Sequence, residues 1–382
     1  MTLPTHATVA GLSGERFTAV YQLAGTREEA HARAVDVCLE QTVEFPADLV
    51  PAGDIEEHII GRIESFEPSS TGYTAAISFP VEIVGDELTQ LLNVIFGNIS
   101  IKPGIRLRKL TLPDSLLAKF KGPRFGQVGW RALLNIHDRP LLCTALKPMG
   151  LTAAALADLA YRFALGGLDI IKDDHGLANQ PFATYQERVE LCSAAVERAN
   201  RETGLRCIYM PNVSAPTDQI VERALFAKQA GAGALLICPG LTGFDTMRVL
   251  ADDDHIALPL MSHPSWYGSM VTSHENGISH YALYGQIQRL AGADASIYPN
   301  FGGRFSFSRD ECRSIAEGCE APMGHLKPIF ATPGGGMSME KIPAMRELYG
   351  DKVIYLIGGG LHRYSDDLVE NVRYFIRLVQ GQ

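Results

Sequence analysis

Four consecutive residues, Lys172, Asp173, Asp174 and His175, bring an amine, two carboxylates and an imidazole into one short segment. They follow the apolar run 167–171, which has the composition of a buried β-strand. In a parallel barrel, the carboxyl ends of the strands carry the catalytic groups. Asp and His side chains are common ligands of divalent metals. The segment therefore predicts a metal site, and the alternative is a solvated charge cluster after a strand.

Lys172 is the unusual member of this cluster, because an ammonium group repels a metal cation. The conflict disappears if the amine is deprotonated and reacts with CO2, since the resulting carbamate is an oxygen ligand. We therefore expect Lys172, Asp174 and His175 to act together as metal ligands.

Two further candidates follow other apolar runs. Lys147 ends the run 140–146, and a lysine at that position can donate or accept a proton if burial lowers its pKa. The alternative is a lysine in a surface loop. His263 follows the run 256–261, and we expect it either to orient a substrate hydroxyl or to be a structural histidine.

Glycine triplets at 334–336 and 358–360 follow the last two of these runs. Glycines at this point allow backbone N–H groups to close on a phosphate, which is the usual phosphate position of a TIM barrel. A single triplet is often only a tight turn. Two triplets after the appropriate strands, together with the metal cluster, indicate a metal-dependent enzyme that acts on a phosphorylated small molecule.

These groups need a scaffold of alternating strands and helices. Stretches 153–164, 185–202 and 216–230 have helical periodicity. The expected strands start roughly 22 to 39 residues apart, the length of one βα unit, and are residues 140–146, 167–172, 206–210, 234–238, 256–261, 295–298, 326–331 and 353–357. Eight such units in one segment predict a (β/α)8 TIM barrel, with a doubly wound sheet as the alternative.

The chain before the barrel has a different pattern. Strands are expected at 17–23 and 73–80, and helices at 26–40 and 87–96. This mixture predicts an α/β protein in which a small N-terminal α+β domain, residues 1–125, precedes a TIM-barrel catalytic domain, residues 126–382. We place the boundary between residues 119 and 131.

Composition limits the partners. The chain has 382 residues, a net charge of −9 and no polybasic run, which argues against a nucleic-acid partner. The seven cysteines form no CxxC pair and are expected to be reduced core residues of a cytoplasmic protein. No basic segment followed by an apolar stretch opens the chain, and no apolar run reaches membrane-spanning length, so we expect no signal peptide and no membrane partner.

Several segments occur in the order found in one known family: residues 96–99, 139–142, 146–148, 166–175 and 179–182, followed by both glycine triplets. Together they resemble the large chain of RuBisCO over nearly the whole sequence. The resemblance implies an N-terminal α/β domain, a C-terminal TIM barrel and a homodimer. In that dimer, the N-terminal domain of one subunit closes the active site of the other.

The same resemblance implies roles for individual residues. Lys172 corresponds to the carbamylated Mg2+ ligand and Asp174 to a second ligand, whereas His175 stands where the family has a glutamate ligand. Lys147 corresponds to an acid/base lysine near the substrate. The remaining implied residues are Glu40 and Asn98, from the neighbouring subunit, and Gly335, Gly336, Gly359 and Gly360, which hold phosphate.

Three departures from the carboxylase pattern affect the expected activity. Met149 stands where a second lysine follows the Lys-Pro pair, and Pro264 replaces an arginine that binds the second phosphate. The segment 298–305, which in carboxylases carries a lysine that contacts CO2, has Arg304 as its only cation. The pattern is similar to that of a RuBisCO-like protein, which does not fix CO2.

The first hypothesis is therefore an enolase or isomerase that acts on a phosphorylated ketose such as 5-methylthioribulose 1-phosphate, as in methionine salvage. Lys147 would move protons, aided by His263 and the metal site at Lys172. The alternative is a decarboxylase of a phosphorylated 3-oxo sugar acid, of the 3-oxo-isoapionate 4-phosphate type, with Arg304 as the cation that binds the substrate carboxylate. A non-catalytic binding protein and a working carboxylase are the remaining readings.

Overall fold

The computed structural model describes residues 6–305 and 307–381, and the chain divides into two compact units. The N-terminal unit extends to Phe120 and includes the later segments Tyr267–Gln286 and Pro322–Leu326. The barrel unit contains Lys121–Trp266, Ile287–Ala321 and the residues from Lys327 onward. We retain residues 1–125 and 126–382 as the proposed domain limits.

The N-terminal unit is built on a five-stranded sheet in the order β12-β6-β2-β5-β4. Strand β2 pairs antiparallel with β5 and β6, β4 pairs antiparallel with β5, and β12 pairs parallel with β6. The strands are β2 (Arg16–Leu23), β4 (Arg62–Ser69), β5 (Gly72–Pro80), β6 (Ile105–Thr111) and β12 (Gly277–Ile278), with a separate pair of β1 (His6–Ala7) and β3 (Ala52–Gly53).

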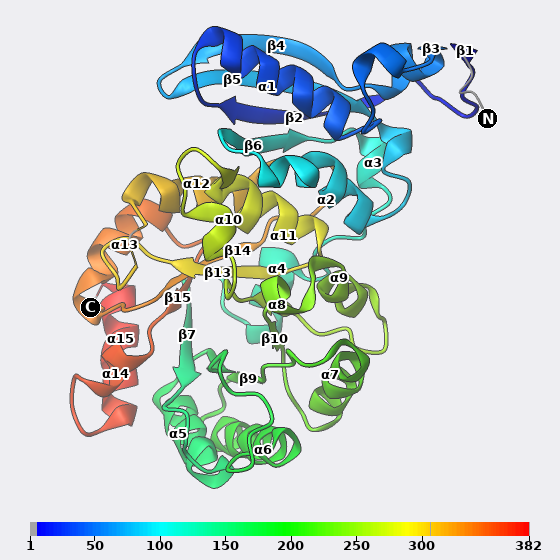
Figure 1. The fold of residues 1–382 in the computed structure, drawn as a ribbon. Coiled ribbons are helices and arrows are strands. Elements are labelled where there is room, and N and C mark those ends of the chain that lie inside the picture. Colours follow the sequence, from blue (N-terminus) through cyan, green and yellow to red (C-terminus); the bar gives the residue numbers. More distant parts are fainter. Residues whose placement is uncertain (1–5, 306, 382) are drawn as a thin grey trace. The chain divides into compact units, whose positions relative to one another are not determined.

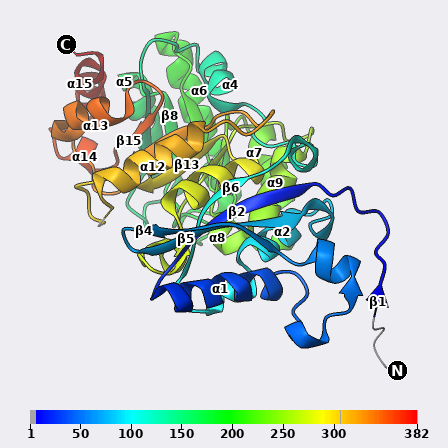
Figure 2. The same ribbon diagram turned by 90° about the horizontal axis from the view of Figure 1, so that it is seen from above.

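Helix α1 (Arg27–Glu40) runs along one face of this sheet in both views (Figures 1 and 2). Its buried residues, Ala30, Ala34, Val37 and Cys38, recur at helical spacing and form one apolar face. Thr26 caps its start, since the Thr26 side chain accepts from the Glu29 N–H while the Glu29 carboxylate accepts from the Thr26 N–H.

The other short elements of the unit complete its cover. They are η1 (Ala47–Leu49), η2 (Ile55–Ile59), η3 (Val81–Ile83), α2 (Leu88–Phe96), η4 (Asn98–Ile101), α3 (Asp114–Leu117), α10 (Gly268–Val271) and η6 (Ala282–Gln286). The predicted strands 17–23 and 73–80 and helices 26–40 and 87–96 are present as β2, β5, α1 and α2.

Strands β4 and β6 were not predicted from the sequence. Strand β4 forms one edge of the sheet and is mostly exposed, so its polar residues carry no apolar alternation. Strand β6 contains three basic residues, Arg106, Arg108 and Lys109, which hide its pattern. Arg106 is nevertheless buried, because its guanidinium donates to backbone carbonyls of Val271 and Ser273.

The barrel unit contains eight parallel strands that close on themselves. They are β7 (Leu141–Leu146), β8 (Ile170–Asp173), β9 (Ile208–Met210), β10 (Leu235–Ile237), β11 (Leu260–Ser262), β13 (Ala295–Pro299), β14 (Phe330–Gly334) and β15 (Ile354–Leu356). Two four-stranded runs, β15-β7-β8-β9 and β10-β11-β13-β14, are joined by the parallel bridges Asn212–Leu236 and Ala331–Val353. This closure confirms the predicted TIM barrel and excludes the doubly wound sheet.

Helix α4 (Gly126–Leu134) precedes β7 and contributes to the barrel core. The helices that follow the strands are α5 (Ala153–Gly166), α6 (Tyr185–Thr203), η5 (Thr217–Gln219), α7 (Ile220–Gln229), α8 (Pro239–Thr242), α9 (Phe244–Asp252), α11 (Ile287–Leu290), α12 (Arg309–Glu320), η7 (Met339–Lys341), α13 (Ile342–Tyr349), α14 (Gly359–His362) and α15 (Leu368–Gln380).

Two strands begin four residues later than the sequence predicts. Strand β11 starts at Leu260 instead of residue 256, and β14 starts at Phe330 instead of residue 326. Pro259 and Pro328 lie in the skipped segments. Proline has no N–H to donate to a neighbouring strand, so pairing begins only after it.

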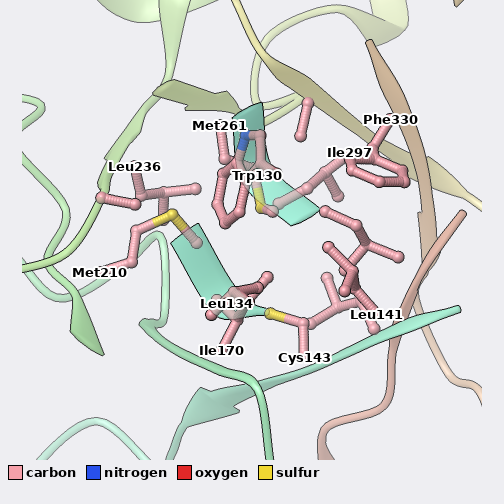
Figure 3. Close-up of a cluster of buried hydrophobic side chains, with 14 residues drawn as sticks. Trp130, Leu134, Leu141, Cys143, Ile170, Met210, Leu236, Met261, Ile297 and Phe330 are labelled. Atoms are coloured by element: carbon pink, nitrogen blue, oxygen red, sulfur yellow. The ribbon is translucent and has the colours of Figure 1, made fainter. Parts of the chain in front are cut away.

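The interior of the barrel is apolar at its centre (Figure 3). Trp130 and Leu134 of α4 lie among side chains from the strands, including Ile170, Met210 and Phe330. The barrel interior is therefore a packed core, and polar groups are left to the strand ends.

Two buried aspartates fasten the amino ends of the strands. Asp169 receives both terminal nitrogens of Arg139 at 2.7 Å and the N–H of Leu142 at 2.7 Å. Asp294 accepts from the N–H groups of Phe125 and Gly126, both at 2.7 Å, and from the N–H of Leu260 at 3.0 Å. Asp294 thus ties the start of α4 to the barrel.

Two general predictions concern the whole chain. All seven cysteines are buried and unpaired, as expected of reduced core residues. In the described part of the chain, no helix combines the length and the apolar character needed to cross a membrane.

Candidate active site

Lys172 lies at the end of β8 and points into the barrel, with 2% of its surface exposed. Its ammonium nitrogen is 2.8 Å from the carbonyl oxygen of Asp173. Burial lowers the pKa of Lys172, and the neighbouring charge of Lys147 lowers it further. The carboxylate of Asp174 opposes this shift, but the lowered pKa makes the uncharged amine, the form that reacts with CO2, more accessible.

Asp173, between the two proposed ligands, faces away from the barrel interior. Its carboxylate accepts from the Tyr209 hydroxyl at 2.7 Å, the Arg188 guanidinium at 3.1 Å and the Asn212 N–H at 3.0 Å. Both Asp173 and Arg188 are fully buried. Of the two carboxylates beside Lys172, Asp173 therefore stabilises the end of the strand, and Asp174 belongs to the site.

Asp174 is the centre of the polar cluster. Its Oδ1 lies 2.6 Å from Lys147 Nζ and 3.3 Å from His175 Nδ1. Burial alone would raise the pKa of Asp174, but hydrogen bonds from His175 and Lys147 and the charge of Lys172 lower it well below its usual value. Asp174 is therefore an anionic oxygen donor at any physiological pH.

His263 joins this group from the end of β11. Its ring stacks on that of His175, with centroids 4.1 Å apart and planes inclined by 14°. Its Nδ1 lies 2.9 Å from the Ser265 hydroxyl oxygen. Burial lowers the pKa of His263 well below its usual value, and the charges of Lys172 and His175 add to this effect.

The two glycine loops lie beside these residues. Gly335 and Gly336 follow β14 with φ angles of 83° and 87°, a backbone region in which other residues are strained. A Cβ atom on Gly360 would come within 2.6 Å of the Met337 carbonyl oxygen, so the two loops pack against each other. A Cβ on Gly358 would lie 3.9 Å from Lys147 Cε, which brings the second loop next to the acid/base lysine.

Arg304 packs across the first glycine loop. Its N–H donates to the Gly335 carbonyl at 2.9 Å, and a Cβ on Gly336 would meet the Arg304 Cγ at 2.4 Å. The residue itself is exposed, and its guanidinium lies 5.3 Å from the centre of the Phe305 ring. The cation therefore lies at the phosphate side of the site.

Glu40 and Asn98 are brought together in the N-terminal unit. The Asn98 amide donates to Glu40 at 3.1 Å and to Glu44 at 2.9 Å. Lys102 Nζ approaches the other oxygen of Glu40 at 3.4 Å and Asp36 at 2.6 Å. These two predicted site residues thus form one polar cluster on α1 and η4, within a different unit from Lys172 and Asp174.

Sequence reasoning missed Cys238, which it treated as a core residue. The thiol follows β10 in the same way that Lys172 ends β8, and its electrostatic partners include Lys172 and Asp174. Burial raises the pKa of the Cys238 thiol, so it stays protonated. Its position at the carboxyl end of a strand was the signal that would have identified it.

The residues around Asp174 can be compared with the donors that a metal ion needs. Across residues 6–305 and 307–381, no three His, Cys, Asp or Glu side chains are grouped as a ready-made metal site. Asp174 offers an oxygen donor and His175 a nitrogen donor, and a third donor requires carbamylation of Lys172. The buried amine of Lys172, held toward its neutral form, fits that chemistry.

Comparison with known proteins agrees with this arrangement. Residues 127–370 match the family model described as ribulose bisphosphate carboxylase large chain, catalytic domain. The chain belongs to the RuBisCO large-chain family. The expected membership in its RuBisCO-like, non-carboxylating group is confirmed by the relatives that follow.

This RuBisCO-like chain is 38% identical to the 5-methylthioribulose-1-phosphate isomerase of Rhodospirillum rubrum, over 96% of this chain and 97% of that one. It is 30% identical to the 2,3-diketo-5-methylthiopentyl-1-phosphate enolase of Bacillus licheniformis, over 95% and 91% of the two chains. The solved structure of the Rubisco-like protein from Rhodopseudomonas palustris superimposes with a TM-score of 0.86, at 35% identity, and covers 96% of this chain and 99% of that one. The RuBisCO-like chain is accordingly an enzyme of the isomerase and enolase type.

Proposed function

We propose that this enzyme isomerises or enolises a phosphorylated ketose of the 5-methylthioribulose 1-phosphate kind, by moving a proton on a carbon next to the carbonyl. The observation that carries the proposal is the contact between Lys147 and Asp174, 2.6 Å long, beside the second glycine loop. The proposal is supported because Lys147, Asp174 and Gly358 lie within the span of one sugar phosphate, as the proposed proton-transfer group, anionic ligand and phosphate loop must.

Lys172 as its carbamate, Asp174 and His175 would hold Mg2+. When bound, the ion supplies a Lewis acid that polarises the substrate carbonyl and lowers the cost of removing the neighbouring proton. The glycine loops at 335–336 and 359–360 would bind the phosphate through backbone N–H groups. Lys147 would then take the proton and return it, with His263 donating a hydrogen bond to a substrate oxygen.

The decarboxylase alternative receives no specific support. It requires Arg304 as a cation for the substrate carboxylate, but Arg304 is exposed and packs on Gly336. The missing lysines at Met149 and Arg304 likewise weigh against CO2 fixation.

The proposal also includes a homodimer in which Glu40 and Asn98 of one subunit complete the site of the other. This part of the proposal is supported by the polar cluster that Glu40 and Asn98 form with Lys102. Mixing two inactive variants, Lys172→Ala and Glu40→Ala, tests this arrangement, because a shared site regains part of its activity on subunit exchange. A mixture that stays inactive while heterodimers form contradicts it.

The reaction itself is tested by incubating the enzyme with Mg2+, bicarbonate and 5-methylthioribulose 1-phosphate in D2O and following the mixture by NMR. We expect deuterium incorporation next to the carbonyl or a new ketose phosphate. A silent spectrum with Mg2+ bound would contradict the proposal and favour the 3-oxo acid decarboxylase.

A further inference from the structure

The ring of His263 is held by an unusual local arrangement. Pro264 has no N–H, so the first backbone amide that can reach the ring is that of Ser265. This N–H donates to His263 Nδ1 at 3.3 Å, and the Ser265 hydroxyl oxygen lies 2.9 Å from the same nitrogen. Two groups of one residue therefore converge on Nδ1.

The backbone amide decides which nitrogen carries the proton. A backbone N–H can only donate, so Nδ1 must offer its lone pair. In a neutral imidazole, the single proton is then on Nε2. For the neutral ring, the direction follows from the donor chemistry of the amide.

Ser265 also interacts with the Cys238 thiol. Burial raises the pKa of Cys238, and the Ser265 side chain opposes that shift, as a hydroxyl that donates to sulfur does. The N–H of Cys238 donates to Ser214 Oγ at 2.9 Å. The backbone N–H of Ser265 therefore remains the group that selects the tautomer.

Stacking against a second imidazole orients the His263 ring. His175 stacks on His263 at 4.1 Å with an inclination of 14°. Within the part of the chain that the structure describes, Nε2 of His263 has no hydrogen-bond partner. The Nε2–H is therefore available to a substrate beside Lys147 and Asp174.

We infer that Ser265 is a positioning residue that holds His263 as its Nε2–H tautomer, so that His263 donates a hydrogen bond to a substrate oxygen and leaves proton abstraction to Lys147. The role toward substrate rests on the proposed function. The tautomer itself is a property of the free enzyme, and it can be measured without turnover.

The first test is the tautomer of the wild-type enzyme. Long-range 1H–15N correlation NMR on protein labelled with 15N-histidine distinguishes a protonated Nδ1 from a protonated Nε2, and the His263→Gln variant identifies the His263 signals. We expect protonation at Nε2 alone. Protonation at Nδ1 would overturn the inference, whatever the activity.

The second test changes the donor into an acceptor. Ser265→Asp keeps the backbone N–H but replaces the hydroxyl with a carboxylate, which only accepts and competes with the 3.3 Å amide contact. Because a charged acceptor forms the stronger hydrogen bond, we expect a protonated Nδ1 and a kcat lower on the order of 10²-fold, with little change in KM. Ser265→Thr is the matched control, because it keeps a hydroxyl and the wild-type tautomer. Thermal unfolding of both variants checks that they are folded.

The outcomes separate the two proposals. If Ser265→Asp changes the tautomer without lowering kcat in an active enzyme, the positioning role is wrong. If it leaves the tautomer unchanged, the side chain of Ser265 has no positioning role and the backbone N–H alone holds the tautomer. If the wild type shows the Nε2–H tautomer but does not act on 5-methylthioribulose 1-phosphate, the proposed substrate fails while the assignment of the tautomer to Ser265 stands.

Discussion

Lys147 and Asp174 link the carboxyl ends of β7 and β8, with Nζ 2.6 Å from Oδ1. The same Oδ1 also contacts His175 at 3.3 Å. One carboxylate oxygen therefore serves the acid/base lysine and a proposed metal ligand together. Any change at Asp174 must affect both.

Replacing Lys147 tests its chemical role. The Lys147 side chain is 39% exposed, so its ion pair adds little to the free energy of unfolding after solvent screening. We expect Lys147→Met to remain folded and to lose about 10² to 10⁴-fold in kcat, the usual contribution of a general acid/base. Deuterium exchange of the substrate measures it, and an exchange rate equal to wild type would remove Lys147 from the mechanism.

Lys172→Met separates metal chemistry from stability. Methionine fills similar space without a buried amine, so we expect a free energy of unfolding within about 1 kcal/mol of wild type or higher. Turnover that depends on Mg2+ and bicarbonate should disappear. Urea unfolding and assays over a bicarbonate series measure the two effects, and a variant that still responds to bicarbonate argues against a carbamate on Lys172.

His175→Glu restores the residue type found at this position in carboxylases. A carboxylate adds a charged oxygen donor, so we expect tighter Mg2+ binding by isothermal titration calorimetry, by ~10-fold. His175→Gln is the neutral control and should not bind more tightly. Equal affinities of wild type and His175→Glu would mean that residue 175 does not touch the ion.

The pair of Arg188 and Asp173 supports the site from behind. Both side chains are fully buried, so Arg188→Met leaves the carboxylate of Asp173 without its cation. We expect a loss of about 3 to 5 kcal/mol in the free energy of unfolding, measured in urea. The double variant with Asp173→Asn should recover much of that loss, and no recovery would show that Arg188 acts through packing alone.

Asp294 predicts a pH dependence of stability. Burial raises its pKa to about 6, although three backbone N–H groups oppose the shift. Because this pKa lies above the unfolded value of about 3.9, the folded state binds the proton more tightly. The contribution of Asp294 is therefore complete below pH 4 and is lost as pH rises through about 6, on the order of 3 kcal/mol.

Asp294→Asn isolates this effect, since the amide does not titrate. The free energy of unfolding of wild type minus that of Asp294→Asn, from urea unfolding at several pH values between 4 and 7, should fall as pH rises. Parallel curves for the two proteins would show that the pKa of Asp294 is not raised in the folded state.

The barrel could be predicted from the sequence because its strands are buried on both sides and read as separate apolar runs. Strand β8, for example, is entirely buried. The edge strand β4 and the basic strand β6 could not be predicted, because their formation depends on pairing with strands elsewhere in the chain and not on an apolar pattern of their own. The late starts of β11 and β14 follow from Pro259 and Pro328, whose effect on pairing depends on the neighbouring strand.

The site was predictable where residue type and strand position agree. Lys147, Asp174 and His263 each follow a strand, Lys172 lies near the end of one, and the four lie together. The orientation of Asp173 was not predictable, because it depends on Arg188 and Tyr209, which lie 15 and 36 residues away. Ser265 escaped notice for the same reason, since its role arises from its contacts with the His263 ring, whereas Cys238 could have been identified from its position after β10.

Trp130 and Leu134 of α4 pack into the barrel core, and Asp294 ties this helix to the strands. This arrangement has an evolutionary consequence. Because the frame is secured at the end opposite the catalytic loops, a loop can be exchanged without endangering the ability to fold. Replacement of single side chains such as those at 149, 264 and 304 is then a permitted path by which descendants of one ancestor diverge in the reactions that they catalyse.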